Sequence, residues 1–231
     1  MKKYPRTYHL PFSPEVHSDD KLCDVSDLYR IIDEQVEVVI TEKLDGGACC
    51  LKAHAGVMAR SHGQETSCSS FNYIKNVHYY PNMQDIIEQN LMICGENMFA
   101  IHSIEYTNLQ DYFYVFNIVD GNAMQFMNYD SVVDWANTHN MLTVPEVYRG
   151  KIPSLQWLEK FLAVELKKPS GLGGHREGFV VRVKSAFPVD DFSKNVFKYV
   201  RANHVQNKID DETGKIQHWS RNWVAAKLNK G

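Results

Sequence analysis

The sequence lacks any apolar run long enough to cross a membrane, and none of the segments of low polarity approaches the roughly 20 residues that a spanning helix needs. Its first residues, MKKYPRTYHLPF, include two lysines but no apolar stretch of the kind that follows them in a secretory signal. Membrane-embedded and exported proteins are therefore disfavoured, and we expect a cytoplasmic protein.

Paired cysteines are also missing. The five cysteines (23, 49, 50, 68 and 94) are odd in number and form no CxxC, and the neighbours Cys49 and Cys50 cannot easily bond to each other. A zinc site that combines them with some of the ten histidines stays open, but no ligand spacing supports it. We expect most of them to be small buried hydrophobic residues.

There is no internal repeat and no Pro/Ser-rich linker, and GLGGH at 171–175 is not a dinucleotide fingerprint because no helix clearly follows it. The 231 residues with 44% apolar content suffice for one sizeable core. The net charge is only −3, which disfavours a generally basic nucleic-acid binder. However, residues 194–231 have a net charge of +5 and the remainder of the chain has −8. This distribution suits a polyanionic partner that binds on one side, but an ordinary solvated helix surface explains it equally.

Apolar periodicity and turn residues predict an α+β fold with largely antiparallel sheets, because most expected strands neighbour each other along the chain. The expected strands are 36–43, 48–53, 56–60, 91–96, 112–118, 178–183 and 195–200. The expected helices are 24–35 with Ser26 as cap, 83–89, 130–139 capped by Asp130, 154–166 capped by Ser154, and 219–228. The segments 61–70 and 167–175 are expected to be loops.

The stretch TEKLDGG at 41–47 places a lysine at the end of an expected strand. Asp45-Gly46 alone favours a hairpin turn with charged edge residues. The alternative is a lysine presented to a ligand that approaches the glycine backbone. On a strand, Glu42 and Lys43 would point to opposite faces.

Similar charged residues stand at or beside the ends of other expected strands, often next to glycine. In chain order they are Lys43, Asp45, Arg60, Glu96, Glu177, Lys198 and Arg201. Each one alone is as readily a solvated surface charge, but their recurrence suggests one site assembled from several strands.

This order resembles the covalent nucleotidyltransferases, which include ATP-dependent RNA and DNA ligases and messenger-RNA capping enzymes. Their Lys-x-Asp-Gly element is similar to Lys43-Leu44-Asp45-Gly46, and later elements are similar to 95–96 (GE), 114–118 (YVFNI), 177–182 (EGFVVR) and 197–199 (FKY). The resemblance runs from about residue 36 to 204, and its last part, KYVRANHV, looks most like phage and bacterial RNA ligases.

The resemblance implies an ATP-grasp-like nucleotidyltransferase (adenylation) domain that uses ATP and Mg²⁺ (or Mn²⁺) to join 5′-phosphate and 3′-hydroxyl ends of RNA, possibly DNA, in the cytoplasm of a bacterium or phage host. Its alternatives are the adenylation domain of a DNA ligase and a non-catalytic nucleic-acid-binding module. Because 27 residues after His204 are too few for an oligonucleotide-binding barrel, we expect a single adenylyltransferase domain over 1–231 with a short basic C-terminal extension.

The resemblance also implies roles for individual residues. Lys43 would be the adenylated nucleophile, and Asp45 would orient it or its metal. Glu96 would bind ribose or metal, Glu177 would support the metal, and Phe116 would stack on adenine. Arg60 would contact phosphate or the terminal nucleotide, Lys198 would hold the α-phosphate, and Glu42 and Arg201 would complete the nucleotide site. From its residue type alone, Phe116 is more simply a core aromatic.

A free lysine has a pKa of about 10.4, so an attacking amine must lose a proton that burial or nearby cations make easier to remove. Lys198 and Arg60 are the candidate cations. Two positions depart from the family: Val200 stands where a second lysine is common, and Asn117 where an aspartate is common. Arg201 could replace the missing lysine, although a strand would direct it to the other face.

Overall fold

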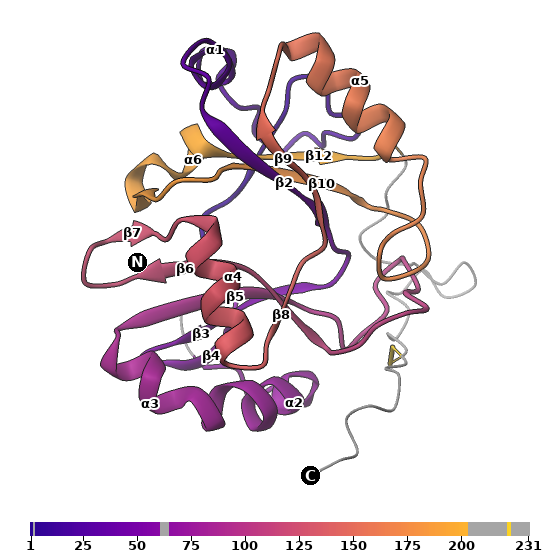
Figure 1. The fold of residues 1–231 in the computed structure, drawn as a ribbon. Helices are drawn as coiled ribbons and strands as arrows, with labels where there is room; N and C mark the ends of the chain where they lie inside the picture. Colours follow the sequence, from indigo (N-terminus) through magenta and orange to yellow (C-terminus); the bar gives the residue numbers. More distant parts are fainter. Residues whose placement is uncertain (2, 61–64, 203–220, 223–231) are drawn as a thin grey trace.

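A computed structural model shows two sheets, one above the other, with helices on their outer faces (Figure 1). It describes residues 1, 3–60, 65–202 and 221–222. Sheet A has the strand order β1-β12-β10-β2-β9, and sheet B has the order β11-β7-β6-β5-β3-β4 with β8 beside β6. The α+β fold with largely antiparallel sheets is thereby confirmed, since among the described strands only β1–β12 and β6–β8 pair in parallel.

The seven expected strands are found with bounds close to those predicted, but the six-residue strand β9 and the short strands β1, β7, β8 and β11 were not expected. Sheet A contains β1 (Tyr8–His9), β12 (Val196–Val200), β10 (Gly178–Val183), β2 (Glu37–Lys43) and β9 (Glu146–Lys151). Sheet B contains β11 (Phe187–Pro188), β7 (Gln125–Phe126), β6 (Phe113–Asp120), β5 (Leu91–Asn97), β3 (Gly47–Lys52), β4 (Gly56–Ala59) and β8 (Leu142–Thr143).

Helices cover each sheet on the side away from the other sheet. Above sheet A lie α1 (Val25–Asp33) and α5 (Leu155–Glu165), and α6 (Phe192–Asn195) precedes β12. Below sheet B lie α2 (Asn72–Ile74), a π-helical turn (Lys75–Tyr79), α3 (Tyr80–Glu88) and α4 (Tyr129–Thr138) (Figure 1). Short 3₁₀ turns span Ser69–Phe71 and Val189–Asp191.

The alternation of side chains on β2 decides what each residue contacts. Val38 and Ile40 pack in one core cluster with helix residues such as Leu28 of α1 and Leu158 of α5. Val39 instead belongs to the cluster of sheet B. Because side chains on a strand alternate, Lys43 shares the face of Val39, between the sheets, and Glu42 shares the face of the helices.

Several local expectations are corrected. The segment Leu44-Asp45-Gly46 is not a hairpin turn, because β2 and β3 belong to different sheets and this segment crosses between them. The caps of α1 and α4 are Asp24 and Asn128 rather than Ser26 and Asp130, because their side chains accept the free N–H groups of the first turn.

Ser154 caps α5 as expected. The helix expected at 83–89 is wrong in its start, since α3 begins at Tyr80 with Pro81 in its first turn, where the missing N–H of proline costs nothing. The helix expected at 219–228 and most of the basic segment 194–231 lie outside the described residues.

Of the five cysteines, Cys68 is exposed and the other four are buried. Within the described part of the chain, no group of three metal-binding side chains of the His, Cys, Asp or Glu type is found. A search of the same residues finds no helix that could span a membrane.

Candidate active site

A pocket opens between the two sheets where β2 ends. Its space is ≈ 700 Å³ when the open solvent at its mouth is included. The lining combines both sheets and the N-terminal segment: Tyr4, Thr7, Thr41, Glu42, Lys43, Leu44, Ala48, Arg60, Glu96, Phe116, Asn117, Val144, Val180, Arg182 and Val196. Five of the nine predicted site residues therefore line it, although the chain separates them widely, and Asp45, Glu177, Lys198 and Arg201 are not part of the lining.

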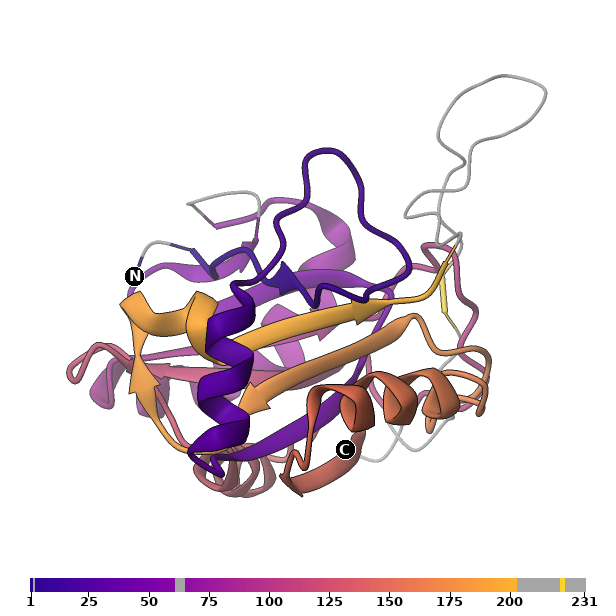
Figure 2. The same ribbon diagram turned by 90° about the horizontal axis from the view of Figure 1, so that it is seen from above.

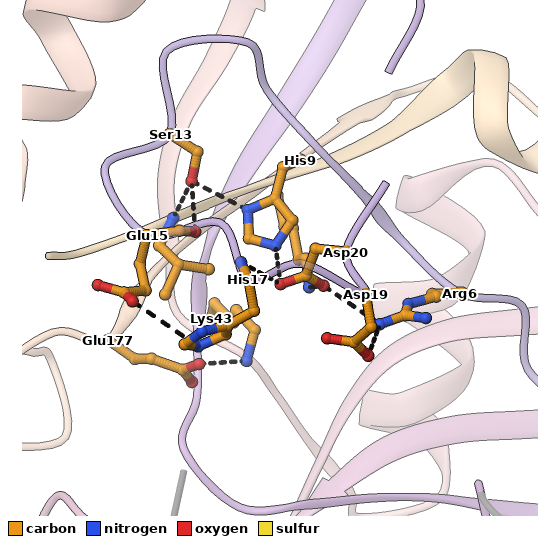
Figure 3. A network of polar contacts seen from close by, with 11 residues as sticks. Arg6, His9, Ser13, Glu15, His17, Asp19, Asp20, Lys43 and Glu177 are labelled. Carbon is orange, nitrogen blue, oxygen red and sulfur yellow. Dashed lines mark hydrogen bonds and ion pairs between the residues drawn. The ribbon is translucent and has the colours of Figure 1, made fainter. Parts of the chain in front are cut away.

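Lys43 and Glu177 form an ion pair at the centre of this site (Figure 3). The Lys43 Nζ to Glu177 Oε1 distance is 2.5 Å. The register of sheet A brings them together, because Lys43 pairs with Gly178, the residue after Glu177. Glu177 is 2% exposed and Lys43 is 28% exposed, so the carboxylate is fixed while the lysine remains reachable from the pocket.

Gly178 is required by this register. A Cβ on Gly178 would lie 1.9 Å from the backbone oxygen of Tyr199 on the neighbouring strand β12. The glycine next to Glu177 thus lets β10 approach β12 closely, and it leaves no side chain between Lys43 and Val200, which both pair with it.

The pKa of Lys43 is raised above its ordinary value. Burial works to lower it, but the carboxylates of Glu177, Glu96 and Asp45 together outweigh burial. The expectation that neighbouring cations lower this pKa therefore does not describe the unliganded site, in which the acidic neighbours, Glu177 first, raise it.

Sheet B supplies Glu96, Phe116 and Arg60 opposite Lys43. Burial raises the pKa of Glu96 to about 8, although Lys43 acts against this rise. Phe116 is half-buried and lines the pocket, with its ring centroid 5.1 Å from that of Tyr4. Arg60 follows β4 and is exposed at the pocket, where its charge also lowers the pKa of Glu96.

The crossing segment holds its own shape through Asp45. One oxygen of this buried carboxylate accepts hydrogen bonds from Ser103 N at 2.8 Å, Ser103 Oγ at 2.7 Å and Ile104 N at 2.8 Å. The backbone N–H of Asp45 donates to Tyr106 Oη at 2.9 Å. These bonds fix the segment that follows Lys43.

Gly46 completes this crossing. A Cβ there would lie 2.6 Å from Asn97 O and 3.0 Å from the Glu96 side chain, so a larger residue would push β5 away. The glycine of the Lys-Leu-Asp-Gly element thus brings the lysine segment against the strand that carries Glu96.

Glu42 points away from Lys43, as strand alternation predicts. Its carboxylate accepts from Ser170 Oγ at 2.5 Å and Gly171 N at 2.9 Å, and it pairs with Arg176 Nε at 3.0 Å. The side chain therefore anchors the 167–175 loop, and only its strand position borders the pocket. Arg176 in turn binds Glu165 at the end of α5.

Lys198 lies on β12, with its ammonium 3.1 Å from the Asp20 carboxylate. Val200 is 5% exposed and pairs with Gly178. The following Arg201 contributes its backbone N–H to Glu177 O at 2.9 Å. At the position of the family's second lysine there is thus a buried apolar residue in this chain.

Sequence reasoning missed residues that the N-terminus and β10 bring to the pocket. Asn117 donates from Nδ2 to Tyr4 Oη at 3.2 Å and accepts from Arg182 Nη1 at 2.5 Å. An aspartate at position 117 could only accept, so the amide here serves both partners. Burial lowers the pKa of Arg182 to about 10. The contact between Tyr4 and Asn117 joins residues 113 positions apart, and no local pattern marks it.

Comparison with known proteins agrees with this geometry. A model of the RNA ligase family matches residues 36–200. The chain therefore belongs to the RNA ligase family. No curated protein sequence matches it at a significant level.

Among solved structures, variants of Naegleria gruberi RNA ligase share the fold. A variant with ATP and Mn has 19% sequence identity and a TM-score of 0.55, with 87% of this chain and 58% of that chain covered. The Naegleria enzyme with pyrophosphate gives the same identity and TM-score over 87% and 59% of the two chains. The chain thus spans less than two thirds of the length of the Naegleria ligase.

Proposed function

We propose that this chain is an ATP-dependent RNA ligase that works through an adenylated lysine. The observation that carries the proposal is the position of the Lys43 ammonium at the end of β2, where it pairs with Glu177. Across the pocket it faces Glu96, Arg60 and Phe116. The family membership and the Naegleria complexes with ATP and Mn support ATP as the nucleotide.

In the first step Lys43 Nζ, after losing a proton, attacks the α-phosphorus of ATP. A phosphorus–nitrogen bond forms, and the bond to the pyrophosphate oxygen breaks. AMP then passes to a 5′-phosphate, which makes a phosphoanhydride and frees the lysine. Finally a 3′-hydroxyl attacks the same 5′-phosphorus and AMP leaves.

The two walls of the pocket divide the recognition of ATP. Phe116, beside Tyr4, offers an aromatic face to the base, and Glu96 offers a carboxyl group to the ribose hydroxyls. Arg60 and Lys198 supply cations for the phosphates, where charge develops in each transition state. Arg201 and Glu42 act on the site through the backbone of Glu177 and through the 167–175 loop.

The carboxylates fit a divalent cation that is shared with the nucleotide. Mg²⁺ commonly binds one or two protein carboxylates together with phosphates and water, and Glu96 and Glu177 both flank Lys43. The lack of a three-residue metal cluster among the described side chains agrees with such a shared mode. A bound cation would offset the carboxylate charge that now raises the pKa of Lys43.

A labelling experiment tests the proposal. The protein is incubated with ATP labelled at the α-phosphate and with Mg²⁺, and the covalent adduct is measured after denaturation. We expect an alkali-stable adduct that acid or hydroxylamine releases, as a phosphorus–nitrogen bond requires, and none with Lys43→Ala. Lys151→Ala, an exposed lysine at the far end of β9, is the matched control and should label fully. Absence of an adduct in the wild type would contradict the proposal.

End-labelled strands then distinguish the substrates. We expect joining of a 5′-phosphorylated RNA strand to a 3′-hydroxyl end with release of AMP. Joining of DNA strands alone would favour the DNA ligase alternative, and transfer of GMP to a 5′-diphosphate RNA end would indicate a capping enzyme.

A further inference from the structure

Lys198 is held by the N-terminal strap, which we define as residues 6–20. The strap follows β12 through β1 and then arches back, as the indigo segment beside β12 in Figure 2 shows. The last residue of the strap is Asp20. One of its carboxylate oxygens lies 3.1 Å from Lys198 Nζ, and the other lies 3.1 Å from His9 Nε2. His9 itself is the β1 partner of Lys198 in the sheet register.

We propose that Asp20, together with His9, is a positioning residue that holds the Lys198 ammonium where it meets the reacting phosphate. This inference rests on the proposed function, in which Lys198 is the phosphate cation. Nothing in the Lys-x-Asp-Gly pattern or in the later strand motifs points to Asp20, which lies 23 positions before Lys43.

The burial of this trio separates it from an ordinary surface ion pair. The side chains of His9, Asp20 and Lys198 are 2%, 9% and 15% exposed. Exposed pairs keep many geometries and contribute little, whereas a buried pair whose remaining polar atoms are satisfied has essentially one arrangement. Lys198 is therefore preorganised rather than free to swing.

Polar contacts surround His9 (Figure 3). Burial and the neighbouring Lys198 lower the pKa of His9 to about 4, so the ring is neutral at pH 7. Nε2 of the neutral ring lies 3.1 Å from the Asp20 carboxylate, and Nδ1 can accept from Ser13 Oγ, 3.0 Å away. Ser13 Oγ also accepts from Val200 N at 3.0 Å, which ties these contacts to β12.

Asp20 stays ionised in this setting. Burial acts to raise the pKa of Asp20, but the His17 N–H and Lys198 outweigh it and bring the pKa to about 2. Burial lowers the pKa of Lys198, and Asp20 acts against that fall. The carboxylate thus favours a charged as well as a positioned Lys198.

The strap has other attachments that do not depend on Asp20. Leu10 is fully buried, and its N–H donates to Lys198 O at 2.8 Å. Glu15 N donates to Val200 O at 3.3 Å. Asp20→Asn, which keeps the side-chain shape, should therefore leave the strap docked and change mainly the hold on Lys198.

A double-mutant cycle tests this inference on the full chain. The rate of self-adenylation at saturating ATP is measured in a single turnover for the wild type, Asp20→Asn, Lys198→Ala and the double variant. We expect Asp20→Asn to lose about tenfold to a hundredfold, the scale of a misplaced catalytic group. The double variant should be no slower than Lys198→Ala, because Asp20 acts only through that lysine.

Asp19→Asn is the matched control. It removes the same charge one position earlier, from a carboxylate that is 77% exposed and pairs with Arg6 at 2.7 Å. We expect a change of less than about twofold, since exposed pairs contribute little. Thermal unfolding of each variant shows that the compared proteins are folded, and if Asp20→Asn is unfolded the same cycle is run with His9→Asn.

The outcomes are distinguishable. Wild-type rates for Asp20→Asn, or losses that multiply in the double variant, would overturn the positioning role while leaving the ligase proposal intact. Equal losses in Asp19→Asn and Asp20→Asn would also overturn it, because a general charge effect would explain both. A wild type that takes no label from ATP would refute the proposed function itself.

Discussion

Sheets A and B face the same pocket with different chemistry. Sheet A presents Lys43, Glu177 and Lys198, which are tied into ion pairs at 2.5 and 3.1 Å. Sheet B presents Glu96 and Phe116, for which no ion pair is found among the described residues. The difference suggests that sheet A performs the phosphate chemistry in every step, whereas sheet B recognises the nucleoside of ATP.

The largest effect is expected for Lys43 on sheet A. Lys43→Ala should reduce self-adenylation by about 10³-fold or more, because no other group can form the phosphorus–nitrogen bond. The measurement is the amount of labelled adduct per folded protein. Substantial labelling of this variant would move the nucleophile elsewhere and remove the basis of the comparison.

The next largest effects are expected for the partners of Lys43 on the same sheet. Glu177→Ala and Lys198→Ala should each slow the joining of a strand supplied already adenylated by about 10²–10³-fold, the usual cost of one preorganised charge contact. Lys184→Ala, which removes a partly exposed lysine just after β10 that pairs with Glu37, serves as control. Joining at the wild-type rate by both variants would show that sheet A does not act on the shared phosphate.

Sheet B should respond differently. Phe116→Ala should raise the KM for ATP by roughly tenfold, since stacking of a base on an aromatic ring contributes about 1–3 kcal/mol. It should change the joining of an adenylated strand less, because the charges on sheet A remain. The KM for ATP and the rate of joining an adenylated strand are both measured. A loss confined to the rate of joining would mean that Phe116 acts on the phosphate chemistry rather than on the base.

A smaller effect concerns pH and stability. The pKa of Glu96 is raised to about 8 in the folded protein, above that of an unfolded chain, so its contribution to stability is present at low pH and lost as the pH rises through 8. Glu96→Gln should therefore gain thermal stability over the wild type between pH 5 and 9 in the presence of a chelator. The expected scale is about 2–4 °C for each kcal/mol.

A constant difference in melting temperature across this range would mean that Glu96 is ionised throughout. In that case the sheet B carboxyl would resemble Glu177 in charge, and the two sheets would differ less than proposed.

Much of the fold could be predicted because its strands follow local rules. Alternating apolar residues and turn residues predict seven of the twelve described strands, although not β9, and the sequence position of Ser154 predicts the cap of α5. The hairpin reading of Asp45-Gly46 failed because a local turn signal does not report which sheet the next strand joins. That choice depends on long-range pairing of β3 with β5.

The site was only partly predictable for the same reason. Lys43, Glu96, Glu177 and Lys198 stand in recognisable strand-end patterns, and the structure places their elements around one pocket. Tyr4 reaches that pocket through its contact with Asn117, and Asp20 contacts Lys198; each contact spans more than 100 positions of the chain. Such contacts cannot be predicted from the charge pattern or the apolar periodicity of a single sequence.

The most direct test of the account separates Lys43 from Glu177 in the last step. Both variants, Lys43→Ala and Glu177→Ala, receive an RNA strand that is already adenylated at its 5′ end, with Mg²⁺ and without ATP, and the joined product is measured over time. The account predicts that Lys43→Ala still joins the strand, well above the rate of Glu177→Ala, because AMP leaves without bonding to the lysine. Joining by the wild type but not by Lys43→Ala would contradict it.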